Sequence, residues 1–189
     1  MLKTIALAMA TVLGAVALGT VASPGQARAL ELGLTPSQVF GLWVNINNSL
    51  LAVGGLTSDD ERWVGELSAT APKPFEGKQP RDVLALVKAF QSRFHDFHSP
   101  HNDESPGRRT GTPSGDGGER TVTPSDVFLE SGHVLDDLVG HILELGNRKL
   151  PITQFYARNS FRGKTPSHVY GLVDLAHRRL ASILAKSRS

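Results

Sequence analysis

One short phrase recurs along this chain and constrains its fold more than any other feature. It reads TPSQVFGLW from Thr35, TPSDVFLES from Thr123 and TPSHVYGL from Thr165, with a more divergent copy, QPRDVLALV, from Gln79. The spacing of about 43 residues lies within the range of helical repeat proteins. The chain is therefore expected to build one type of helical unit four times.

The phrase has the composition of a helix start. Threonine is a favoured N-cap residue because its hydroxyl accepts a hydrogen bond from an amide of the first turn. The proline that follows fits the first helical position, where its missing N–H has no partner to lose. At the third helical position, an acid, Gln or His can bond back to the cap. These four side chains belong to Gln38, Asp82, Asp126 and His168.

Each predicted helix carries an apolar stripe at offsets of 4, 8, 11 and 15 residues from its cap, a spacing typical of helix bundles. Ser131 is the polar member of this stripe. The complete set is Val39, Trp43, Ile46 and Leu50; Val83, Val87, Phe90 and Phe94; Val127, Ser131, Val134 and Leu138; and Val169, Val173, Ala176 and Leu180. Each helix is expected to run for about 17–22 residues, or about 25–33 Å.

The copies alternate in what precedes them. The second and fourth follow a Phe-x-Gly-Lys sequence, whereas the first and third follow Leu34 and Val122. This alternation predicts two tandem helical hairpins, residues 30–98 and 123–189, joined by a flexible linker over 99–122 that is rich in Gly, Pro and Ser. The expected fold class is all-α, either a four-helix bundle or a short α-solenoid.

Two connecting segments differ in their predicted structure. The stretch TSDDERWVGEL, from Thr57, has a capped acidic start and predicts a short extra helix. Residues 150–161, LPITQFYARNSF, are aromatic and are expected to be less helical.

The first 29 residues have the layout of a secretory signal peptide. A short positive start precedes an apolar run, and Ala27 and Ala29 form an Ala-x-Ala cleavage pattern. An uncleaved leader that anchors the helices as the outer domain of a receptor is the alternative, since about 18 apolar residues can span a bilayer. No later stretch is expected to cross a membrane. The protein is accordingly predicted to be periplasmic or secreted.

Removal of the leader changes the charge balance. The chain has 20 Lys and Arg against 18 Asp and Glu, and Lys3 and Arg28 would leave with the leader, so the mature charge is zero. Nucleic acid is therefore not expected as a partner, because it selects a basic surface. The sequence contains no cysteine, so the exported protein has no disulfide to stabilise it and depends on its core.

Histidines cluster at the expected end of the second helix, in FHDFHSPHND. His95, His98 and His101 recur every three residues, and two of them would lie one helical turn apart. Imidazole with nearby carboxylates suits Zn, Ni or Cu. A polar helix end running into a loop explains the same residues, because histidine is favoured near the negative end of a helix.

Enzymatic chemistry has little support in the sequence. There is no Cys nucleophile and no G-x-S-x-G motif, and the glycine-rich GDGGER follows no predicted strand. The acidic pairs are interpreted as solvated helix faces. No cofactor is expected, except a metal ion if the histidines bind one.

Aromatic and basic residues around the Phe-x-Gly-Lys turns are the predicted partner-binding set. They either pack the return segments onto the bundle or line a groove between helices, where exposed aromatic patches mark partner sites. The set comprises Phe75, Lys78, Phe155, Tyr156, Phe161 and Lys164. The favoured function is a non-enzymatic module that binds a protein or small molecule in the cell envelope; the alternative is a metal-binding or metal-sensing protein that uses His95, His98 and His101.

Overall fold

The computed structural model describes residues 33–98, 121–145 and 151–188, and residues Glu31–Ser189 cluster as one compact unit. The described part is helical and contains no strand, which confirms the all-α prediction. The predicted leader and linker lie outside the described residues. The elements are α1 (Pro36–Thr57), α2 (Glu61–Ala69), α3 (Pro80–His98), α4 (Pro124–Glu144), the 3-10 helix η1 (Ile152–Tyr156) and α5 (Pro166–Lys186).

The four long helices begin at the prolines that the sequence indicated, and each is capped in the same way. At every start the side chain of the third helical residue accepts the N–H of the cap residue. The acceptors are Gln38 Oε1 at 2.8 Å, Asp82 Oδ2 at 2.8 Å, Asp126 Oδ2 at 2.8 Å and His168 Nδ1 at 3.1 Å. Because these bonds are local, each helix start is determined by its own sequence.

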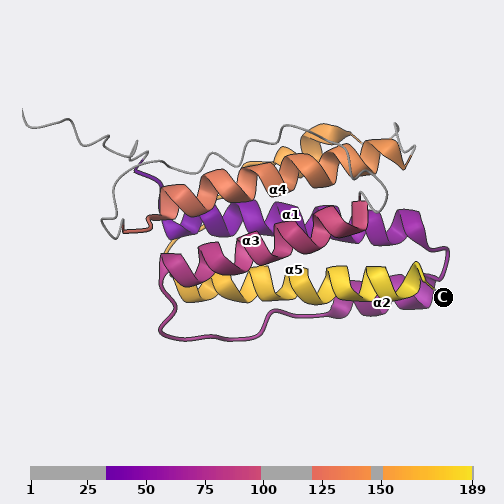
Figure 1. Cartoon of the computed structure of the whole chain (residues 1–189), viewed down its shortest axis with the longest axis horizontal. Helices are drawn as coiled ribbons and strands as arrows, with labels where there is room; N and C mark the ends of the chain where they lie inside the picture. Colours follow the sequence, from indigo (N-terminus) through magenta and orange to yellow (C-terminus); the bar gives the residue numbers. More distant parts are fainter. Residues whose placement is uncertain (1–32, 99–120, 146–150, 189) are drawn as a thin grey trace, which may run out of the picture. The chain divides into compact units, whose positions relative to one another are not determined.

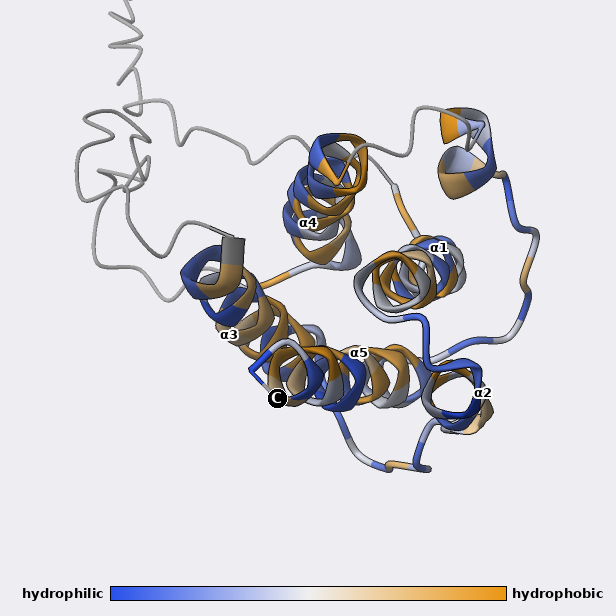
Figure 2. Cartoon of the chain, turned by 90° about the vertical axis from the view of Figure 1, so that its right-hand side faces the viewer, coloured by the Kyte–Doolittle hydropathy of each residue, from blue (hydrophilic) through white to orange (hydrophobic). Residues whose placement is uncertain are grey.

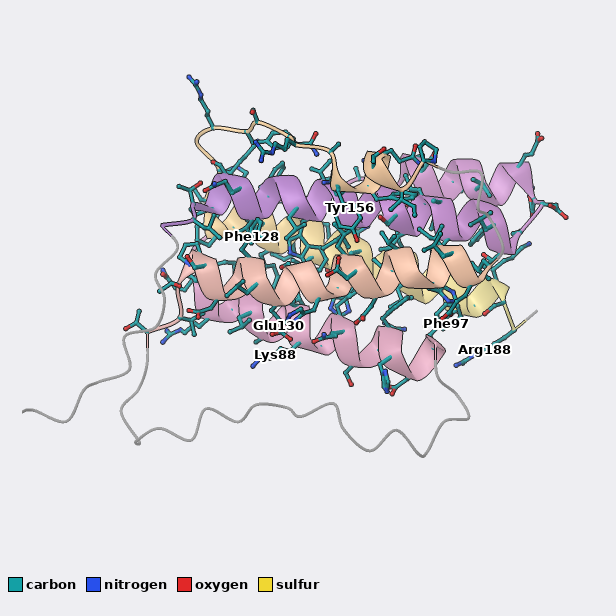
Figure 3. The ribbon with its side chains drawn as sticks, turned by 90° about the horizontal axis from the view of Figure 1, so that it is seen from above. Lys88, Phe97, Phe128, Glu130, Tyr156 and Arg188 are labelled. Carbon is teal, nitrogen blue, oxygen red and sulfur yellow. The ribbon has the colours of Figure 1, made fainter. Side chains whose placement is uncertain are left out.

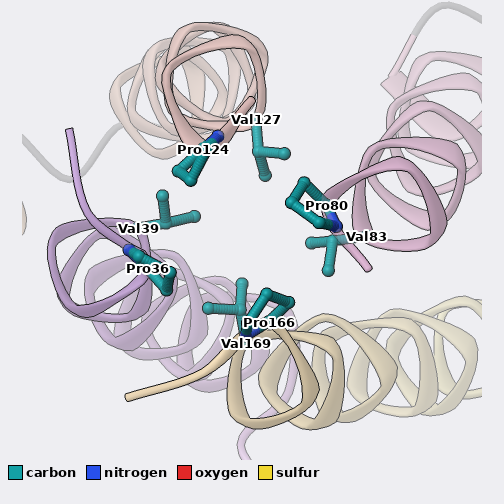
Figure 4. A pocket seen from close by; sticks show the side chains of 8 residues that line it. All are labelled: Pro36, Val39, Pro80, Val83, Pro124, Val127, Pro166 and Val169. Carbon is teal, nitrogen blue, oxygen red and sulfur yellow. The ribbon is translucent and has the colours of Figure 1, made fainter. Parts of the chain in front are cut away.

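All four long helices start at the same end of the bundle and run in the same direction (Figure 1). Around the bundle the order is α1, α4, α3, α5, so α1 lies diagonally opposite α3. At the shared end, the prolines of the first turns and the valines three residues further on surround a common axis (Figure 4). The bundle is therefore parallel, with its helix N-termini gathered at one face.

This packing differs from two tandem hairpins. The first predicted unit contains α1 and α3, and the second contains α4 and α5. The two helices of each unit lie diagonally opposite each other, so both neighbours of every long helix come from the other unit. The ring is closed rather than extended as a solenoid. Long connections permit this arrangement: an extended chain advances about 3.3 Å per residue against 1.5 Å in a helix, so 58–79 can return the full length of α1.

The core contains every residue predicted for the apolar stripes, and none of them is more than 3% exposed. Viewed along the helices, hydrophobic residues face the common centre (Figure 2). Trp43 packs edge-on against Phe90, with 5.8 Å between ring centroids. Its indole N–H donates to Ser131 Oγ at 2.8 Å, so the polar member of the stripe provides both space and a hydrogen-bond acceptor for the tryptophan.

The segments that lead into three helices are attached to a neighbouring helix through a serine near its start. The bonds run from Lys164 N to Ser37 Oγ at 3.1 Å, from Lys78 N to Ser167 Oγ at 3.0 Å and from Leu34 N to Ser125 Oγ at 3.4 Å. In all three segments a glycine with φ between 61° and 67° stands two residues before the cap: Gly33, Gly77 and Gly163. Only glycine adopts this left-handed conformation without strain.

Helix α1 corrects one expectation about membrane spans. By length and composition α1 is apolar enough to cross a bilayer. No such stretch after the leader was expected from the sequence. More than half of its most apolar window is buried inside the bundle. A helix that is apolar on most sides is also typical of a protein core, and α1 contacts α2, α4, α5 and η1.

Candidate binding cleft

A cleft of about 610 Å³ lies between α1, α4 and the chain that follows η1. We call it the α1–α4 cleft. Its volume is within the range of about 300–1,000 Å³ that is typical of ligand sites. Its lining consists of Gln38, Gly41, Leu42 and Asn45 of α1, Phe128 and Leu135 of α4, and Tyr156, Ala157, Arg158, Asn159 and Ser160.

Apolar side chains from the two helices form much of the wall. Leu42 and Phe128 are partly buried, and Leu135 is buried. In Figure 3, Phe128 and Tyr156 lie on the α1 side of α4, while Glu130 lies on the side that faces Lys88 of α3. The two α4 side chains that line the cleft are therefore aromatic and aliphatic, whereas Glu130 faces α3.

The third wall is an extended segment that α1 holds in place. Asn45, which is 6% exposed, donates from Nδ2 to the Ala157 carbonyl at 2.9 Å and accepts from Asn159 Nδ2 at 2.7 Å. Gly41 allows the same segment to approach closely, because a Cβ there would lie 3.2 Å from the Asn159 carbonyl oxygen. This wall is thus fixed by side-chain bonds to a rigid helix.

Tyr156 lines the cleft and is tied to α4. Its hydroxyl donates to Asp136 Oδ1 at 2.8 Å, and its side chain is 46% exposed. Partial burial, and next the hydrogen bond to the Asp136 carboxylate, raise the pKa of Tyr156 to about 12. The phenol is therefore a neutral donor at physiological pH, and its bond to α4 links the return segment across the cleft.

The predicted partner-binding residues do not form a single surface. Phe161 packs edge-on against Phe40 of α1 at 4.9 Å between centroids, and Lys164 Nζ lies 4.6 Å from the Phe40 ring. In a second arrangement of the same kind, Phe75 packs on Tyr170 of α5 at 4.9 Å and Lys78 Nζ lies 4.5 Å from that ring. These four residues attach the return segments to the bundle, as one of the two interpretations of the sequence stated.

The remaining two members of the predicted set are adjacent in sequence but differ in burial. Phe155 is 4% exposed and belongs to the core, whereas Tyr156 lines the cleft. The sequence reasoning missed the other cleft residues. An available signal was Asn45, a polar residue within the apolar run of α1, since a buried polar group requires a hydrogen-bond partner.

The predicted metal ligands are only partly described. His95 is exposed in the last turn of α3, which ends at His98, while the side chain of His98 and all of His101 lie outside the described residues. Among the side chains that the structure describes, no three of the His, Asp and Glu type are grouped closely enough to hold a metal. Metal binding by this cluster stays a prediction.

A second groove, between α5 and α1, is occupied by α2. Trp63 Nε1 donates to Ser182 Oγ of α5 at 3.3 Å, and Leu67 packs beside Gly54 of α1. The helix start is also fixed, because Asp60 accepts from the Trp63 N–H at 3.1 Å and pairs with Lys186 at 3.1 Å. The bond from the Trp63 amide, followed by that from Lys186, lowers the pKa of Asp60.

Arg179 of α5 anchors the end of α2. It is 6% exposed and donates to Asn47 Oδ1 at 3.2 Å and to the carbonyls of Ser68 and Thr70, each at 3.3 Å. Burial lowers the pKa of Arg179, and the neighbouring charge of Arg178 adds to the effect. The carbonyls at a helix C-terminus carry partial negative charge, so they suit a buried guanidinium.

No known protein family, curated protein or solved structure matches this chain. The geometry of the cleft and the chemistry of its lining are therefore the basis for the function proposed next.

Proposed function

We propose that the protein is an exported, non-enzymatic helical module that binds a ligand or partner of the cell envelope in the α1–α4 cleft. The observation that carries this proposal is the cleft itself, which has the volume of a ligand site and walls from three separate segments. The signal-like pattern of the first 29 residues supports export.

The way in which the cleft is built also supports binding. Two of its walls are long helices with a common core, and the third is attached by the two Asn45 bonds and by the Tyr156 bond to Asp136. Walls that are already ordered reduce the entropy lost when a ligand binds. Apolar surface combined with a few polar groups is typical of small-molecule sites.

Native mass spectrometry of the protein purified from its own envelope tests the binding role. We expect an additional bound mass that is absent in Leu42→Trp, because the larger side chain takes up part of the cleft and blocks the ligand. Lys88→Gln, an exposed change on α3, is the matched control and should keep the bound mass. Loss of the ligand from both variants, or from neither, would contradict binding in the cleft.

The export part of the proposal has an independent test. We expect the mature protein to begin at Leu30, which N-terminal sequencing measures directly. A mature protein that still begins at Met1 and stays with the membrane fraction would favour the anchored receptor domain instead.

Metal binding is the second candidate. It is favoured by the extent of α3, which places His95 and His98 three residues apart at the helix end. Elemental mass spectrometry of the untagged protein should find one equivalent of Zn, Ni or Cu, and the variant with His95, His98 and His101 all changed to Ala should lose it. A metal-free native protein would remove this candidate.

A further inference from the structure

We propose that the α1–α4 cleft binds an amphipathic monocarboxylate, meaning an aliphatic chain or ring that carries one carboxylate group. This inference rests on the proposed function, since it specifies the ligand of the same cleft. Two features of the described residues carry it: the apolar wall and the single charged lining residue.

The apolar wall fits a short aliphatic or aromatic body. Phe128 and Leu135 stand seven residues apart on α4, which corresponds to about 10 Å along the helix. Leu42 of α1 lies across from them in the same lining. An extended octanoyl chain has this length, and removing its methylenes from water stabilises binding by about 0.8 kcal/mol per group.

The charge of the lining selects an anion. Arg158 is the charged residue among the eleven that line the cleft, and no ion pair joins it to the described part of the chain. The Asp136 carboxylate, which accepts the Tyr156 hydroxyl, and Asp126, which takes part in the cap of α4, both lie outside this lining. One guanidinium matches one carboxylate, with which it can form two parallel hydrogen bonds.

Isothermal titration calorimetry with octanoate and octan-1-ol tests the proposal, because the two probes share the chain and differ in charge. We expect octanoate to bind once per protein and about tenfold or more tightly than octan-1-ol. Arg158→Gln should weaken octanoate binding about tenfold and leave octan-1-ol unchanged. Arg162→Gln is the matched control, since Arg162 is exposed in the same return segment but is not part of the lining.

The location of the site is checked by amide chemical shifts, which should change around Leu42, Phe128 and Arg158 when octanoate is added. Equal affinity for the two probes, an unchanged affinity in Arg158→Gln, or shifts confined to another face would overturn the inference. If the native protein carries a cleft ligand that Leu42→Trp removes, yet octanoate does not bind, the proposed function stands and the monocarboxylate is wrong.

Discussion

Two return segments lie in two grooves of this bundle, and they leave those grooves in different states. The segment 58–79 contains the nine-residue α2 and occupies the groove between α5 and α1. The segment 151–165 contains only the five-residue η1 and leaves an open cleft between α1 and α4. Both then dock on a helix through the same serine bond and the same aromatic and lysine contacts.

The difference shows that the docking of a segment and the filling of a groove are separate features. Lys78 and Lys164 stand in equivalent docked turns, so docking does not explain why one groove is open. The closed groove has a buried cation, Arg179, that gathers carbonyls from α2, whereas the open cleft has Asn45, which binds only two residues of extended chain. A full helix fills one groove, whereas the other stays open, so the α1–α4 cleft has the room for the proposed ligand.

The largest expected effect comes from removing the anchor of the closed groove. Arg179→Met leaves the carbonyls of Ser68 and Thr70 and the side chain of Asn47 without their donor. Each unsatisfied buried acceptor costs about 1–3 kcal/mol, and some will reach water, so we expect a loss of about 3 kcal/mol in unfolding free energy. Urea denaturation measures the loss, and hydrogen exchange should show α2 opening first.

Arg178→Met is the adjacent control. Arg178 is partly exposed and pairs with Asp174 at 2.9 Å, a contact expected to contribute less than about 1 kcal/mol. Equal losses in the two variants would show that burial of Arg179 does not distinguish the closed groove.

Alanine at Gly41 of α1 and Gly171 of α5, the helical glycines that the backbone of the return segments approaches most closely, compares the two docked segments directly. A Cβ at Gly171 would lie 2.7 Å from the Lys73 carbonyl oxygen, so the backbone must move, and we expect a loss of about 2 kcal/mol. At Gly41 the nearest atom is 3.2 Å away, and the gain of about 1 kcal/mol in helix propensity should offset the crowding. Thermal unfolding of both variants measures the difference, and the opposite order would contradict this account.

Replacing Asn45, which holds one wall of the α1–α4 cleft, should have a smaller effect on stability. Asn45→Ala deletes the bonds to Ala157 and Asn159, and we expect a loss of about 1–2 kcal/mol in unfolding free energy. Asn48→Ala, an exposed change on the same helix, should change stability by less than about 0.5 kcal/mol. Limited proteolysis should cut residues 157–160 faster only in the first variant; unchanged cleavage would mean that Asn45 does not hold this wall.

Acidification should weaken the start of α2 and not the start of η1. The pKa of Asp60 is lowered in the folded protein, so its ionised carboxylate stabilises the fold at pH values above the pKa of the unfolded chain, near 3.8. This stabilisation is lost as the pH falls through the pKa of Asp60 in the folded protein. The cap residue of η1, Pro151, has no side-chain bond to lose. Hydrogen exchange, corrected for the intrinsic rate at each pH, should rise for α2 below about pH 4; Asp60→Asn should remove this dependence.

Several of these features could be predicted because they depend on residues close together in the sequence. Thr123, Pro124 and Asp126 define a helix start within four residues, and the stripe offsets identified the core of every long helix. The cleft could not be predicted in the same way. It depends on Phe128 facing Leu42, residues that are far apart in the chain and carry no shared motif.

Sequence patterns are enough to predict where the long helices begin, which side of each is buried and that a short helix follows Asp60, because caps and apolar periodicity act over a few residues. The parallel direction of the helices and the position of α1 opposite α3 become evident only in the folded bundle. A stripe that is apolar along its whole length can be buried by a parallel or an antiparallel neighbour. Contacts between distant segments distinguish the two, such as Lys164 with Ser37 and Arg179 with Ser68, and they exist only once the chain has folded.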